Sequence, residues 1–133
     1  MVFAAMLLMF SSATWADEYD DIVNGCNFAN AEFGIVAIQI CIKDNQAARA
    51  AVLQYPEEVK DIVARCVRGR EMGWLMVKLC IEKDIEAEAA LANYGREHDS
   101  SMEKCKAEFG RRGAARIKAC VDQAIEADRS SRN

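Results

Sequence analysis

Six cysteines are the residues of this chain with the clearest capacity for chemistry: Cys26, Cys41, Cys66, Cys80, Cys105 and Cys120. A cysteine can form a disulfide, bind a soft metal ion as a thiolate, or act as a nucleophile or redox group when its pKa is lowered. These uses require different neighbours. The spacing of the cysteines therefore helps to decide between them.

The cysteines divide the chain into three repeats with a period near 40 residues. The first cysteines of successive repeats are 40 and 39 residues apart, and the second cysteines are 39 and 40 apart. A glycine precedes each second cysteine by seven residues, at Gly34, Gly73 and Gly113. Apolar residues recur at steps of three and four, as in Trp74, Val77 and Ile81. This period, without strand-like alternation, is typical of stacked helical hairpins.

We therefore predict an all-α fold of three tandem helical hairpins, forming a short α-solenoid or six-helix stack. Gly69 and Gly73 stand where the second hairpin must reverse, a place that favours residues tolerant of positive φ. Pro56 suits a first helical position, and Ser100 with Glu103 suits a capping box. The expected helices span residues 18–31, 35–55, 57–69, 73–94, 100–110 and 113–129.

Distance decides how the cysteines can pair. If residues 66–80 formed one continuous helix, its two cysteine Cα atoms would stand about 21 Å apart at ~1.5 Å per residue, whereas a disulfide tolerates at most about 7 Å. A reversal near Gly73 brings both cysteines to matching height on antiparallel helices. The repeat then selects, from fifteen possible pairings, the disulfides Cys26–Cys41, Cys66–Cys80 and Cys105–Cys120.

The N-terminal segment MVFAAMLLMFSSATWA, residues 1–16, predicts a cleaved secretory signal peptide, although it has no Lys or Arg. An uncleaved apolar helix or a membrane anchor is the alternative, but the apolar run is short for a bilayer span. We expect a periplasmic or secreted protein without a stable membrane span after cleavage. The mature chain would be a single domain, residues 17–133, with repeats 17–56, 57–98 and 99–133.

Residues for catalysis are scarce. The one histidine, His98, lies in the polar stretch REHDS, where we expect a solvated loop. The chain has no second histidine, no Cys-x-x-Cys, no glycine-rich phosphate loop and no Gly-x-Ser-x-Gly elbow. We therefore predict no catalytic residues, no bound metal and no cofactor, and we do not expect an enzyme.

Binding of Cu(I) is the alternative use of the cysteines. Reduced thiolates facing the interior of a helical bundle would suit this soft ion, and Met72, Met76 and Met102 would add thioether ligands. An oxidising compartment favours disulfides instead. In that case we expect the methionines to fill turns and the core.

One position of the repeat places polar residues on the face that should pack. Four residues after the second cysteine stand Asn45, Asp84 and Ala124. Asp84 could contact a ligand or partner. The structural interpretation is a hydrogen bond from Asp84 to a tyrosine or a backbone group across the stack, which would fix its register.

Charge changes along the chain, from −6 over residues 17–58, through 0 over residues 59–98, to +2 over residues 99–133. A net charge of −4 disfavours nucleic acid as a partner. The asymmetry suits head-to-tail self-association, or docking of a charged protein or an anionic surface, unless it serves solubility alone. The basic residues that would take part are Arg111, Arg112, Arg116 and Lys118.

The segment GWLMVKLCIEKDIEAEAAL, residues 73–91, resembles an element of uncharacterised exported bacterial proteins in which Gly-Trp, Val-Lys-x-Cys and Asp-Ile-x-Ala-Glu recur in tandem. In the first and third repeats Ile35 and Ala114 replace the tryptophan. The resemblance implies tandem helical hairpins and export, and no activity. We expect a small binding or structural module that engages another protein in the periplasm or cell envelope, with Cu(I) handling as the alternative.

Overall fold

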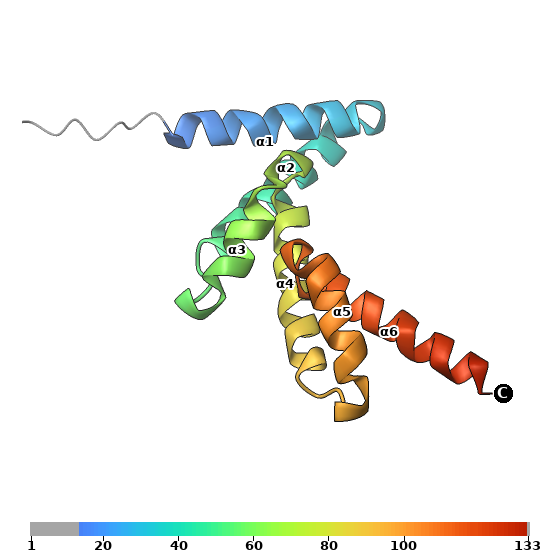
Figure 1. Cartoon of the computed structure of the whole chain (residues 1–133). Helices are drawn as coiled ribbons and strands as arrows, with labels where there is room; N and C mark the ends of the chain where they lie inside the picture. The colour runs from blue at the N-terminus through green and yellow to red at the C-terminus, as the bar shows by residue number, and fades with distance from the viewer. Residues whose placement is uncertain (1–13, 133) are drawn as a thin grey trace, which may run out of the picture. The chain divides into compact units, whose positions relative to one another are not determined.

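The computed structural model describes residues 14–132. Over this range the regular structure is entirely helical, so the predicted all-α fold of three disulfide-stapled hairpins is confirmed (Figure 1). The predicted signal peptide, residues 1–16, lies almost wholly outside the described residues. The helices are α1 (Thr14–Asn30), α2 (Ile35–Val52), α3 (Lys60–Val67), α4 (Trp74–Leu91), α5 (Asp99–Phe109) and α6 (Ala114–Ser131).

Each hairpin reverses through a three-residue 3-10 turn that ends at a glycine. Gly34, Gly73 and Gly113 have φ values of 82°, 95° and 97° with extended ψ. Only glycine adopts this backbone region readily, which explains why glycine recurs seven residues before the second cysteine. Gly69 was also expected to need a positive φ, and this was wrong: its φ is −95°. The turn Arg70–Met72 and a single glycine complete the reversal.

The connections between hairpins are also alike. Pro56 (φ −69°, ψ 160°) and Gly95 (φ −67°, ψ 156°) adopt nearly the same extended conformation, and each directly precedes a 3-10 turn. Pro56 therefore stands just before the first helical position and not in it. The expected capping box at Ser100 is wrong, because α5 is already helical from Asp99 and no side chain caps it.

The chain forms two compact units, one ending at Gln46 and the other beginning at Ala47 within α2. In the second unit α4 contacts α3, and α6 packs against both α4 and α5 (Figure 1). Its core is made of the predicted inward faces of the helices. The single domain over residues 17–133 stays a prediction. Buried apolar residues of this unit include Ile62, Trp74, Val77, Ile81, Ala87 and Val121.

Candidate functional site

All three hairpins are closed by disulfides. The pairs Cys26–Cys41, Cys66–Cys80 and Cys105–Cys120 have Cα–Cα distances of 5.7, 5.8 and 5.8 Å, which confirms the pairing predicted from the repeat. None of the six cysteines carries a free thiol. In this oxidised state the sulfurs brace the hairpins and present no thiolate for nucleophilic attack.

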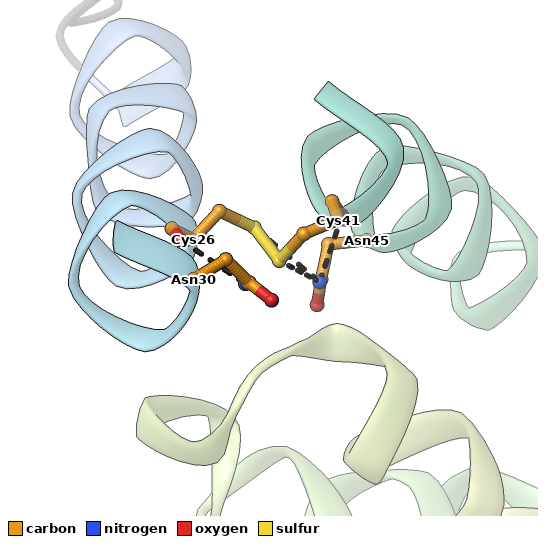
Figure 2. The surroundings of a disulfide bond; sticks show 4 residues. All are labelled: Cys26, Asn30, Cys41 and Asn45. Atoms are coloured by element: carbon orange, nitrogen blue, oxygen red, sulfur yellow. Dashed lines mark hydrogen bonds between the residues drawn. A yellow bond between two sulfur atoms is a disulfide. The ribbon is translucent and has the colours of Figure 1, made fainter. Parts of the chain in front are cut away.

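Two asparagines flank the disulfide of the first unit (Figure 2). Asn45 donates from Nδ2 to the carbonyl of Cys41 at 3.0 Å, and the same nitrogen lies 3.6 and 3.8 Å from the two bridged sulfurs. Asn30 donates to the carbonyl of Cys26 at 3.1 Å. Asn45 is buried, as its position on the packing face predicted. These polar contacts lie beside the disulfide and belong to its local support.

Asp84 occupies the position equivalent to Asn45 and connects three helices of the second unit. Its carboxylate accepts hydrogen bonds from Arg65 on α3, one of them from Nε at 3.1 Å, and from the backbone N–H of Ala115 at 2.9 Å. Gly113, the N-cap residue of α6, has no side chain to cap that helix. Asp84 therefore supplies the cap from α4, where a negative charge also favours the helix dipole.

The backbone hydrogen bond predicted for Asp84 is thus confirmed. Its suggested role as a partner contact is not supported, because Asp84 is 3 % exposed and its carboxylate is engaged within the fold. The third repeat has Ala124 at this position, so its long helix offers no equivalent carboxylate.

A tyrosine contact also joins the segment that follows α4 to α6, but its acceptor is Asp122 and not Asp84. The hydroxyl of Tyr94 donates to Asp122, and Lys118 Nζ lies 2.7 Å from the same carboxylate. Lys118, followed by Tyr94, lowers the pKa of Asp122 below its ordinary value of 3.8. Lys118 is therefore already paired. His98 lies in a 3-10 turn, edge-on to Tyr94 with ring centroids 6.3 Å apart, and not in the solvated loop that we expected.

The other three basic residues predicted to take part in partner binding face solvent. Arg111, Arg112 and Arg116 are exposed, and the guanidinium of Arg112 lies 6.0 Å from the ring centroid of Phe109. Within residues 14–132, Arg111 and Arg116 form no ion pair. These three arginines can therefore meet an external acidic group, and their role in partner binding stays a prediction.

An apolar stripe, which we define as Met72 in the turn before α4 and Leu75, Met76 and Leu79 on α4, was not anticipated. These side chains are between 40 and 66 % exposed. Leu79 follows Leu75 by four residues and Met76 by three, which places these three on one helix face, and Met72 lies in the turn before Gly73. Met72 lies in a turn, as expected, although it is exposed, whereas Met76 lies exposed on α4 and fills neither a turn nor the core. Met102, by contrast, is half-buried.

The first unit carries a counterpart of this stripe. Phe33, Val36 and Ile40 stand eight, five and one residues before their second cysteine, as Met72, Leu75 and Leu79 do, and they are 56 to 67 % exposed. The apolar steps of three and four that predicted the long helices cover only their inward face. A comparison of the outward positions between repeats would have found the stripe. The third repeat has Arg112, Ala115, Arg116 and Ala119 at the four positions.

One trio in the described part of the chain has the spacing of a metal site: one ligand atom each from Cys66, Cys80 and Asp84, all within 4.8 Å of one another. The two sulfurs are joined in a disulfide, and Asp84 is already bound to the Arg65 guanidinium and to the positive end of α6. A cation would meet repulsion there. Met76 lies exposed on α4 and Met72 lies exposed in the preceding turn, so this geometry gives the Cu(I) alternative little support.

No family model, curated protein or solved structure matches the chain. The resemblance to exported repeat proteins therefore stays an expectation. Among the described helices, none is both long and apolar enough to cross a membrane. Three disulfides indicate an oxidising environment outside the cytosol.

Proposed function

We propose that this chain is an exported helical-repeat scaffold that binds another protein through the apolar stripe of its second hairpin. The observation that carries the proposal is the recurrence of large exposed apolar side chains at equal positions of two repeats. Single exposed apolar residues are common on any protein. Three on one helix face, with Met72 in the adjoining turn, form a patch of the kind that marks interaction surfaces.

The third repeat supports the functional interpretation of the stripe. It forms the same hairpin with two arginines and two alanines at the four positions, so the hairpin fold does not require apolar residues there. Methionine, aromatic residues and arginine are enriched in protein interfaces. We infer a partner with an apolar surface bordered by acidic residues, the latter suited to Arg112 and Arg116.

The disulfides would contribute to such a function by holding the hairpins rigid before binding. A preorganised surface loses less conformational entropy when it associates, which improves affinity without additional contacts. The proposal includes no catalytic step, since the thiols are bonded and Asp84 is engaged in the fold.

The proposal is tested with the oxidised protein as bait in envelope extract. The variant Met72→Arg/Met76→Arg carries the residues that the third repeat has at these positions, so we expect it to fold. A specific partner recovered by the original protein should be lost with this variant and kept with Phe28→Arg, a matched change at an exposed residue outside the stripe. Equal recovery of that partner by both folded variants would exclude the stripe as the binding surface.

A further inference from the structure

A groove of about 820 Å³ in the second unit lies between the C-terminal end of α2 and α3. Its lining is mainly apolar and includes Leu53, Tyr55, Val63, Ala64 and Val67. The volume falls within the range of about 300–1,000 Å³ that is usual for small-ligand sites. The groove shares no residue with the apolar stripe.

Two apolar positions of the lining are specific to the second repeat. Ala64 and Val67 stand two residues before and one residue after the first cysteine of their repeat. The first repeat has two asparagines at these positions, and the third has Glu103 and Lys106. All three repeats form the same hairpin, so its packing does not require apolar residues there. Their presence in one repeat alone indicates a local use.

The groove is lined by two arginines and by one further acidic residue, Glu71, which together leave it a net charge of +1. Arg68 and Arg70 line it, are exposed, and form no ion pair with any residue of the described range. Another basic lining residue, Lys60, is already neutralised by Glu57 at 2.7 Å. An apolar floor with unpaired guanidinium groups at its edge is complementary to a molecule that has an apolar body and an anionic head.

We propose that this groove binds a small amphiphilic anion, taken up as a free monomer, with its apolar body along α3 and its anionic group at Arg68 and Arg70. The helix α3 has 8 residues and is about 12 Å long at ~1.5 Å per residue. That length suits a short apolar chain better than a peptide helix with several anchoring turns. The site is separate from the protein-binding stripe and does not depend on it.

Titration calorimetry of the full oxidised protein with octanoate, decanoate and dodecanoate, kept below micelle formation, tests the proposal. We expect saturable binding of one molecule per chain. Each added pair of methylene groups should tighten the Kd by up to about fifteenfold, because one fully buried methylene group contributes up to about fourfold. Dodecanol provides the uncharged comparison.

Two variants locate the site. Ala64→Glu/Val67→Lys copies the third repeat, so it should fold, and it should abolish binding of dodecanoate. Arg68→Ala, also the residue of the third repeat, should weaken dodecanoate up to about fivefold and leave dodecanol unchanged. Ala107→Lys, an exposed position on α5, is the matched control and should bind normally.

Three results would overturn the proposal. One is the absence of saturable binding by the original protein. The second is unchanged binding by the folded Ala64→Glu/Val67→Lys variant. The third is binding to anionic lipid vesicles without any binding of the monomeric carboxylates, which would assign the groove to a membrane surface.

Discussion

Replacement of Gly113 by alanine tests how α6 is held against α4, and Gly34 provides a matched control. Both glycines precede the second long helix of a hairpin and have a positive φ, 97° and 82°. A Cβ at Gly113 would clash with Asp84 Oδ2 and lie 2.8 Å from Arg65 Nε, whereas one at Gly34 meets nothing within 4 Å. Gly34→Ala therefore measures backbone strain, and Gly113→Ala measures the same strain with a steric clash added.

The magnitudes follow from these contacts. Alanine in this glycine-only backbone region costs about 1–3 kcal/mol at either position. At Gly113 the Asp84 carboxylate must also move, which weakens its hydrogen bonds to Ala115 and Arg65. A hydrogen bond to a charged group contributes about 1.5–3 kcal/mol. We expect Gly113→Ala to lower the free energy of unfolding by about 2.5–6 kcal/mol, at least about 1.5 kcal/mol more than Gly34→Ala.

Urea unfolding of the oxidised proteins, followed by far-ultraviolet circular dichroism, measures this difference. With a slope of about 1–3 kcal/mol per molar urea, the midpoint of Gly113→Ala should lie at least about 0.5 M below that of Gly34→Ala. In an Asp84→Ala background the additional cost at Gly113 should largely disappear, since the clashing carboxylate is gone. Equal midpoints for the two glycine variants would refute the packing of Gly113 against Asp84.

The disulfides and the Tyr94 contact yield two further predictions. Native protein from the exported fraction should show no free thiol with a chromogenic thiol reagent, whereas up to six free thiols would support Cu(I) handling instead. The variant Cys66→Ala/Cys80→Ala should lose about 3 kcal/mol of unfolding free energy in urea. The pKa of Asp122 is lowered by Lys118 and then by Tyr94. Its ionised form therefore adds stability at neutral pH that is lost as the pH falls below about 3.8 and through the lower folded-state pKa. The Tm difference between the original protein and Asp122→Asn should shrink from pH 7 to pH 3, and a constant difference would contradict this linkage.

The sequence by itself determined the features that depend on local spacing. The cysteines, the glycine seven residues before each second cysteine and the apolar steps of three and four repeat three times, so they predict the hairpins and the disulfide pairing together. The reason is that a disulfide needs Cα atoms within a few ångströms, and only a reversal at the glycine provides this distance. The same pattern placed Asn45 and Asp84 on the packing face.

The tertiary structure alone decided which partners these residues meet and which faces stay open. The spacing left a tyrosine and a backbone group as equal candidates for Asp84, and the packing of α6 on α4 selected Ala115 and left Tyr94 to Asp122. Because methionine is apolar, we expected Met72 and Met76 to fill turns and the core. Met72 does lie in a turn, but both side chains are exposed. The hydrophobicity of a side chain sets how much free energy its burial would contribute. Whether a neighbouring helix covers it depends on contacts between residues far apart in the sequence.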